Sequence, residues 1–268
     1  MRIIDLSLPI DETAFEVHPV TIERVSHAAG VEKFNRVIMG KTFSGKIKYL
    51  LGQRIVRKED LPDGEFLSLE TVHAPVHVGT HLDYSFHYGS RTEGREAKTA
   101  DEIPLEYCIS NAVKLDFSHK KPNEVIKKED VASALAKINY RLKPLDIVLF
   151  YTGADKLYGT QKYFTDYPGV DISAIDHLLD QGVKIFGVDT MGIDRPYRFM
   201  LKEFLEKKDP KLFYPAHFYG RKREFIHIER LANLDKIPAY GFKVHCLPVR
   251  IRKTGAAWAR VVAVLNTQ

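Results

Sequence analysis

The pattern of apolar and polar residues along the chain predicts short strands separated by helices. Five apolar segments have the length and composition of strands, and they cover residues 3–10, 146–151, 184–188, 225–229 and 257–265. Segments that are this short and this apolar are typical of strands in a largely buried sheet.

Two other segments have the spacing of helices. One helix is expected between Asp171, which can cap its start, and Gly182, which ends it. Its apolar residues share one face, namely Ile172, Ile175, Leu178 and Leu179. A second helix is expected from Asp130 onward. Because strand, helix and strand follow one another, we predict an α/β fold in which helices pack against a mixed β-sheet.

Composition and charge narrow the classes of protein. The 268 residues are 44% hydrophobic, which allows a sizeable core, and no Gly/Ser or Pro tract divides them, so one domain is expected. The formal net charge is +5, yet the 40 basic residues are interleaved with 35 acidic ones. No nucleic-acid recognition motif accompanies them. We therefore expect no nucleic-acid partner, and the charge favours at most an anionic small-molecule substrate.

The chain also lacks the features of a membrane or secreted protein. No window approaches the roughly 20 apolar residues that span a bilayer, and the first residues do not form a signal peptide. Cys108 and Cys246 lie far apart and outside any CxxC context. Reduced, structural thiols in a cytoplasmic protein with no membrane partner are therefore predicted.

A cluster of histidines is the most informative feature of the sequence. The segment HAPVHVGTHLDYSFH contains His73, His77, His81 and His87, with Asp83 among them. Imidazole nitrogen and carboxylate oxygen are the ligands that zinc, manganese and iron accept, so we predict a metal site at His77, His81 and Asp83. On a straight strand the first two would lie about 13 Å apart, too far to share an ion, so a bend at Gly79 is expected.

Residues 77–87 resemble the HxGTHxDxPxH signature of the cyclase family, which includes bacterial kynurenine formamidase and isatin hydrolase. The one departure is Ser85, where the family has proline, so the turn that presents His87 is expected to be less rigid. Weaker likenesses follow along most of the chain, in the segments IIDLSLPI, DIVLFYTGADK, KIFGVDTMGID and HFYGRKREFIHIERLANLD.

The resemblance implies a fold, a metal site and an oligomer. The fold would be the swivelling β/β/α-like fold of the family, and the assembly a homodimer. His77, His81 and Asp83 would bind metal, His217 and Glu229 would complete a two-metal site bridged by Asp83, and His87 would act in catalysis. Zinc is expected, one or two ions per chain, with manganese as the alternative.

Two further positions are open at this stage. On a strand over residues 225–229, Ile226 and Ile228 would face the core, so His227 would point the same way as Glu229 and compete with His217 as the ligand. The spacing from the glutamate favours His217. Asp189 is interpreted as a hydrogen-bonded residue at the end of a strand, and His73 as a structural residue.

Residues 29–67 form a longer segment than a compact formamidase needs. They are predicted to be an insertion, with a hairpin or flap over residues 41–58, and either a flap or dimer arm over the pocket or a solvated loop would account for it. The segment is basic, with Lys41, Lys46, Lys48, Arg54, Arg57 and Lys58.

The predicted function is hydrolysis of a C–N bond in an amide, formamide or lactam by metal-activated hydroxide. Tyr84 follows Asp83 and Phe86 precedes His87, and both could pack against an aromatic or otherwise flat apolar substrate. No GxSxG elbow supports a serine hydrolase. The alternatives are a metal-dependent biosynthetic cyclase or dehydratase acting on a polyketide-like intermediate, and a metal-containing protein without turnover.

Overall fold

The computed structural model describes residues 1–265 and contains two compact units. The main unit consists of Met1–His18 and Pro75–Gln268, and the second, here called the insertion unit, is Pro19–Ala74. The insertion predicted near residues 29–67 falls within this second unit.

A nine-stranded sheet forms the centre of the main unit, in the order β1-β15-β13-β7-β9-β11-β12-β4-β14. Its strands, in that order, are Arg2–Asp5, Val262–Leu265, Phe242–His245, Ile109–Asp116, Ile147–Tyr151, Ile185–Val188, Ile226–Glu229, His81–Asp83 and Ala256–Trp258. Strands β7, β9, β11 and β12 run parallel to one another, whereas the outer pairs are antiparallel. The predicted mixed sheet is confirmed.

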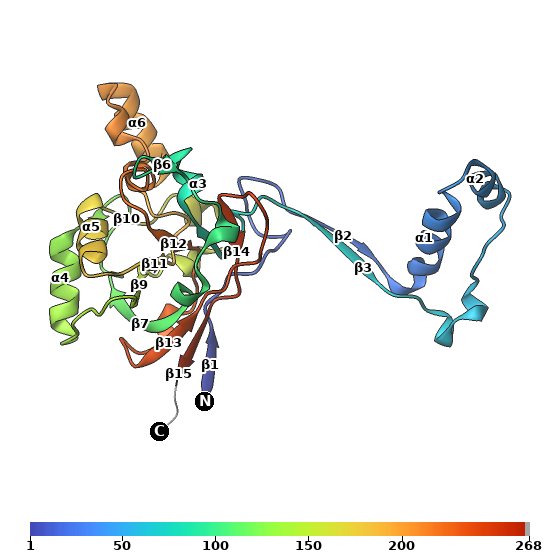
Figure 1. The fold of residues 1–268 in the computed structure, drawn as a ribbon, viewed down its shortest axis with the longest axis horizontal. Coiled ribbons are helices and arrows are strands. Elements are labelled where there is room, and N and C mark those ends of the chain that lie inside the picture. The colour runs from blue at the N-terminus through green and yellow to red at the C-terminus, as the bar shows by residue number, and fades with distance from the viewer. Residues whose placement is uncertain (266–268) are drawn as a thin grey trace. The chain divides into compact units, whose positions relative to one another are not determined.

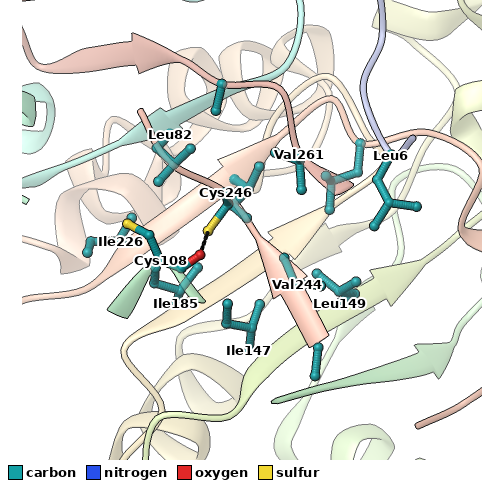
Figure 2. Close-up of a cluster of buried hydrophobic side chains, with 14 of the residues drawn as sticks. Leu6, Leu82, Cys108, Ile147, Leu149, Ile185, Ile226, Val244, Cys246 and Val261 are labelled. Carbon is teal, nitrogen blue, oxygen red and sulfur yellow. Dashed lines mark hydrogen bonds between the residues drawn. The ribbon is translucent and has the colours of Figure 1, made fainter. Parts of the chain in front are cut away.

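Each face of this sheet contributes to a different hydrophobic cluster. In β9, Ile147 and Leu149 point into one cluster, while Val148 and Phe150 point into the other, as the period of two along a strand requires. Helices α4 (Lys128–Lys137) and α5 (Ile172–Asp180) cover the second face and lie side by side (Figure 1). Figure 2 shows the first cluster, with branched side chains from several strands around the two cysteines.

Most of the predicted elements are confirmed, with shifts at their ends. Asp171 caps α5 by accepting a hydrogen bond from the Ser173 N–H, and α4 begins at Lys128, two residues before the predicted start. The strand expected over residues 3–10 ends at Asp5, and the one expected over residues 257–265 is divided between β14 and β15. Cys108 and Cys246 are buried free thiols, as expected.

Within residues 1–265, the main unit also contains three further α-helices and two pairs of short strands. The helices are α3 (Ser85–Tyr88), α6 (Tyr197–Lys207) and α7 (Pro215–Tyr219). The small paired strands are β5 (Arg91–Thr92) with β6 (Arg95–Glu96), and β8 (Val125–Ile126) with β10 (Gly169–Val170). In the part of the chain that the structure describes, no helix is both long and apolar enough to cross a bilayer.

The insertion unit contains a two-stranded ribbon and two helices. The ribbon pairs β2 (Thr21–Val25) with β3 (Leu69–His73), and the helices are α1 (His27–Met39) and α2 (Phe43–Leu50). The hairpin predicted over residues 41–58 is wrong, because α2 occupies its first half. The Thr42 side chain caps α2 by accepting a hydrogen bond from the Gly45 N–H, a local helix signal within the basic segment.

Truncation of Leu149 should test the packing of the first cluster. Leu149 is fully buried in β9, so Leu149→Ala is expected to lower the free energy of unfolding by about 3 kcal/mol, the usual cost of such a cavity. Urea denaturation followed by circular dichroism measures this loss. The control is Ile109→Ala, at a side chain 43% exposed, which should cost less than about 1 kcal/mol. Equal losses in the two variants would contradict the assigned packing.

Candidate metal centre

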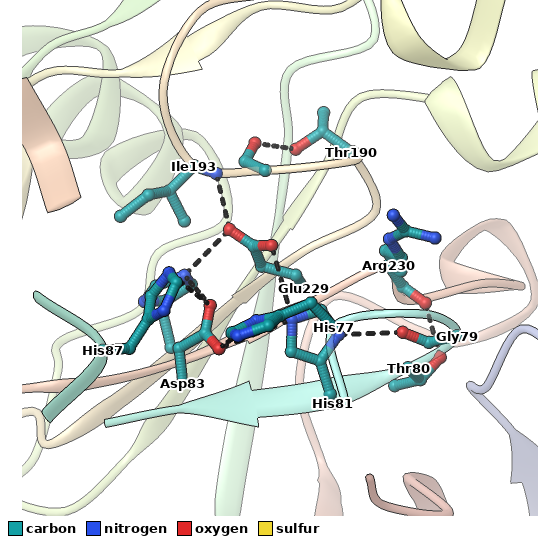
Figure 3. Close-up of polar contacts among 12 residues, drawn as sticks. His77, Gly79, Thr80, His81, Asp83, His87, Thr190, Ile193, Glu229 and Arg230 are labelled. Atoms are coloured by element: carbon teal, nitrogen blue, oxygen red, sulfur yellow. Dashed lines mark hydrogen bonds and ion pairs between the residues drawn. The ribbon is translucent and has the colours of Figure 1, made fainter. Parts of the chain in front are cut away.

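Two neighbouring strands place most of the candidate ligands. Strands β4 and β12 are antiparallel, and their register sets His227 opposite Asp83 and Glu229 opposite His81. Ile226 and Ile228 point into the first hydrophobic cluster, as the alternation in the sequence predicted, so His227 and Glu229 face the other way. Figure 3 shows the carboxylates of Asp83 and Glu229 facing one another among the histidine rings.

A bend before β4 brings His77 close to His81. Gly79 has a φ of +70°, a conformation that side chains larger than hydrogen rarely adopt, and the predicted bend is confirmed. The Thr80 hydroxyl donates to the Arg230 carbonyl and accepts from the Leu8 N–H, which fixes the bend against the end of β12. The His77 and His81 rings consequently lie 5.1 Å apart between centroids.

Asp83 lies close to the other two candidates of the motif, although His81 belongs to neither of the two groups of described residues that could hold an ion. His77 Nδ1 is 3.0 Å from Asp83 Oδ1, and His81 Nε2 is 3.5 Å from the same oxygen. His81 Nε2 is also 3.5 Å from Glu229 Oε2. Its Nδ1 lies 2.9 Å from the Gly79 carbonyl, which can only accept, so Nδ1 carries a hydrogen. In the neutral ring, the lone pair of Nε2 therefore faces the carboxylates.

His217 reaches the same place from α7. Its Nδ1 lies 2.6 Å from Asp194 Oδ2, and the Asp194 carboxylate also accepts the backbone N–H groups of Ala216 and His217. Nε2 lies 3.5 Å from Glu229 Oε1, an oxygen that also accepts the Ile193 N–H. A carboxylate behind a histidine in this way orients the ring and makes the opposite nitrogen a better metal ligand.

The structure brings both competing histidines to Glu229. His227 Nε2 lies 2.9 Å from Glu229 Oε1 and 3.1 Å from Asp83 Oδ2. The sequence left His217 and His227 as alternative ligands. The geometry does not force a choice between them, because the two rings approach Glu229 from different elements.

The donor set fits a divalent metal ion. Among the described residues, two groups could hold one: Asp83, His217, His227 and Glu229 form the first, and His77, Asp83 and His87 form the second. Within each group the ligand atoms lie within 4.8 Å of one another. Asp83 belongs to both groups, as a bridging carboxylate would.

Unpartnered atoms support the same conclusion. His81 Nε2 and both carboxylate oxygens of Asp83 are buried and have no partner in hydrogen-bonding geometry, although two histidine nitrogens approach the oxygens closely. A charged group that is buried without a hydrogen-bond partner destabilises the folded protein by on the order of 3 kcal/mol or more. A cation between these atoms would remove that cost.

The pKa values show how strongly the site attracts a cation. Burial alone would lower the pKa of the His81 imidazole, but Asp83 and Glu229 outweigh it and raise that pKa to about 10. The same two carboxylates raise the pKa of His227 to about 9 against the effect of burial. Burial would raise the pKa of Asp83, but the neighbouring histidines hold it well below its usual value.

His87 differs from the other histidines. It lies on α3, where Gly255 packs so closely that a Cβ there would come within 2.8 Å of the His87 backbone, and this contact fixes the turn although Ser85 replaces the family's proline. The ring lies tilted against that of His77, with 4.3 Å between the ring centroids, and its side chain is 31% exposed. Burial lowers the pKa of His87. The neighbouring His217 and His77 lower it further, and together these effects outweigh Asp83, which raises it, so that the pKa is about 4.

Other predicted residues have different surroundings. Tyr84 is 1% exposed and donates to Glu224, so it offers no surface to a substrate, whereas Phe86 is 48% exposed. His73 is an exposed residue of β3 in the insertion unit. Asp189 follows β11 and accepts hydrogen bonds from Thr152 and Gly153, as a residue at the end of a strand was expected to do.

Two residues around the site were not predicted. Asp194 orients His217, and the Tyr88 hydroxyl lies 2.8 Å from His227 Nδ1. Their positions depend on contacts between segments more than 20 residues apart in sequence. The only local signals were the position of Tyr88 directly after His87 and of Asp194 in the GID sequence after a predicted strand.

Comparison with known proteins identifies the family and the fold. The family model described as "Putative cyclase" matches residues 4–195. No curated protein matches the sequence. An isatin hydrolase bound to the product analogue thioisatinate is similar, with a TM-score of 0.72 and 18% identity over 99% of this chain and 92% of that one.

Two further structures have the same fold. Isatin hydrolase A from Labrenzia aggregata, bound to benzyl benzoate, has a TM-score of 0.69 and 21% identity over 98% of this chain and 93% of its own. A potential metal-dependent hydrolase with cyclase activity has a TM-score of 0.61 and 19% identity over 100% and 99%. The fold is thus that of metal-dependent hydrolases, with a histidine and carboxylate cluster that could hold a metal. Since the family model covers most of the chain, the protein belongs to the cyclase family.

Removal of His81 should empty the centre of metal. Elemental analysis of protein purified without chelator or affinity-tag metal is expected to give near-stoichiometric metal in the wild type and a loss of most of it in His81→Ala, because His81 contacts both carboxylates. His73→Ala is the control, since His73 is an exposed residue of β3 and should leave the metal content unchanged. Metal retained in a folded His81→Ala protein would remove His81 from the ligand set.

Metal binding should release protons. In the metal-free protein, pKa values of about 10 for His81 and about 9 for His227 keep both rings protonated at pH 7, whereas ligation requires neutral imidazole. Calorimetric titration of zinc in buffers of different ionisation enthalpy should therefore show about two protons released in total, one from each ring, when the whole centre is filled. Protonation of these two rings stabilises the metal-free folded protein. The stabilisation is complete below pH 6.5, the pKa of histidine in the unfolded chain, and it is lost as the pH rises through 9 to 10. Binding without proton release would contradict the assigned electrostatics.

Proposed function

We propose that this protein is a metal-dependent hydrolase that cleaves the C–N bond of an amide, formamide or lactam. The observation that carries the proposal is the convergence of histidine nitrogens on two buried carboxylates, with a partly exposed histidine of low pKa at their edge. When bound there, a divalent ion supplies an activated water and an electrophile for the carbonyl group.

The residues around the ions would divide the remaining work. His87 Nε2 lies 3.9 Å from Asp83 Oδ2, and its ring is partly exposed, so it can face both the site and the substrate. Because its pKa is about 4, His87 is neutral at pH 7 and can accept a proton and return it to the leaving nitrogen. Phe86, which precedes it, offers an exposed apolar surface for an aromatic substrate.

A metal-dependent cyclase or dehydratase is the second candidate. The description of the matching family model favours it, because that family is named for cyclisation. The same ligand set would then polarise a carbonyl for enolisation, and His87 would move the proton from carbon. Fold and ligands do not distinguish these two reactions, since one fold hosts many chemistries.

A substrate panel tests the choice between the two. The metal-loaded protein would be incubated with N-formyl aromatic amines, cyclic amides and linear anilides, and the products identified by mass spectrometry. Hydrolysis predicts a gain of one water and a new carboxylate. Conversion with no change in mass, or with loss of water, on candidate cyclisation substrates would replace the hydrolase by the second candidate.

Removal of His87 should separate metal binding from turnover. His87→Ala is expected to keep the ion held by Asp83, His217, His227 and Glu229, a group that does not contain His87, and to lose turnover by about 10²–10⁴-fold, as loss of a general acid–base group does. His245→Ala in β13, outside both candidate groups, is the matched control and should retain activity. Unchanged turnover in His87→Ala would exclude His87 from the mechanism.

A further inference from the structure

His227 is a fully buried histidine whose ring packs between two aromatic side chains. It lies in the middle of β12 and is fully buried, between Ile226 and Ile228, which face the opposite side of the sheet. Its ring is stacked nearly parallel to the rings of Tyr88 and Phe186, at interplanar angles of 16° and 18°. A ring covered in this way can interact with polar groups only through its two nitrogens.

One of these nitrogens, Nδ1, contacts Tyr88. The Tyr88 hydroxyl lies 2.8 Å from His227 Nδ1 and 3.1 Å from the Asp83 carbonyl oxygen, which can only accept. If the single phenol hydrogen goes to that carbonyl, the Tyr88 oxygen accepts a hydrogen from Nδ1. In that arrangement the neutral His227 ring presents the lone pair of Nε2 to Asp83 and Glu229.

The ligand atoms around Nε2 lie within about half an ångström of the separations in a tetrahedral coordination shell. With zinc-to-ligand bonds of about 2.1 Å, ligand atoms at the corners of a tetrahedron lie about 3.4 Å apart. His227 Nε2 is 2.9 Å from Glu229 Oε1 and 3.1 Å from Asp83 Oδ2, and His217 Nε2 is 3.5 Å from Glu229 Oε1. These four residues form one of the two candidate groups, so one ion could be held by protein atoms alone.

We propose that His227 is a metal ligand in addition to His217, and that Tyr88 is the positioning residue that holds it in the ligating tautomer. The inference rests on the proposed metal-dependent function. Four protein ligands make a closed position, as in structural zinc sites, whereas an ion bound through His77 and Asp83 would keep a place for water or substrate. The ion beside His227 would therefore be a fixed charge, and turnover would take place at the other position.

Metal binding without turnover tests this directly. Cobalt(II) would be titrated into metal-stripped protein, its visible absorption recorded, and each affinity measured by competition with a chelator. The wild type should bind two ions, one with the intense absorption of four-coordinate cobalt. His227→Gln should lower the affinity for that ion by at least about 100-fold and remove its absorption. Tyr88→Phe should lower the affinity by about 10–100-fold.

A second tyrosine of the same segment provides the matched control. Tyr84 is as buried as Tyr88, but its hydroxyl donates to Glu224 and not to a candidate ligand, so Tyr84→Phe should leave both ions unchanged. Both ions bound by folded His227→Gln with wild-type affinity and absorption would overturn the role of His227. If that variant does not fold, Tyr88→Phe decides, and behaviour equal to Tyr84→Phe would overturn the proposal.

The proposed hydrolysis can fail separately. A wild-type protein that binds both ions with the expected absorption and hydrolyses no amide would count against the reaction and would leave the assignment of His227 in place. Hydrolysis that persists while His227→Gln retains both ions would count only against the assignment.

Discussion

The repulsion between two buried carboxylates, Asp83 and Glu229, is the constraint on which the rest of the site depends. They lie on adjacent antiparallel strands, where water cannot screen them, so their charges must be offset by groups that the fold supplies. Histidines from the bend at Gly79, from β12 and from α7 surround them. Without metal, protons on these rings offset the charge; with metal, the same nitrogens become ligands.

The outer contacts decide which nitrogen of each ring is available. Gly79 and Asp194 contact Nδ1 of His81 and His217, and Tyr88 occupies the corresponding place at His227. In each case Nε2 is the atom turned toward the carboxylates. His217 and His227 each have a partner from a distant segment, so the geometry of the centre requires the complete sheet and the loops at its end.

The sequence predicts the part of the site that is local. His77, His81 and Asp83 lie within seven residues, and the bend between them followed from chain length alone. The strand over residues 225–229 could also be recognised, and with it the common side of His227 and Glu229. What the sequence could not show is that β12 pairs with β4, which places His227 opposite Asp83 and makes it a neighbour of His217 and not its substitute.

The same limit explains the other differences. Asp194 and Tyr88 act across long sequence separations, and helix α2 of the insertion unit was missed because it is only eight residues long and lies in a basic segment with no buried residue in the helix. The α/β class was predictable since strand and helix patterns are local, whereas strand order was not. Patterns with a period of two or 3.6 residues report which face is buried and do not report which strand lies beside it.

The absence of a side chain at residue 220 has a consequence for how variation in this protein should be interpreted. Gly220 ends α7, and a Cβ atom there would overlap the Tyr88 ring that packs against His227. A substitution at residue 220 would thus resemble the loss of a ligand in a survey of natural or engineered variants. Residue 220 would act through the shape of its neighbours, although it contributes no atom that a metal could bind.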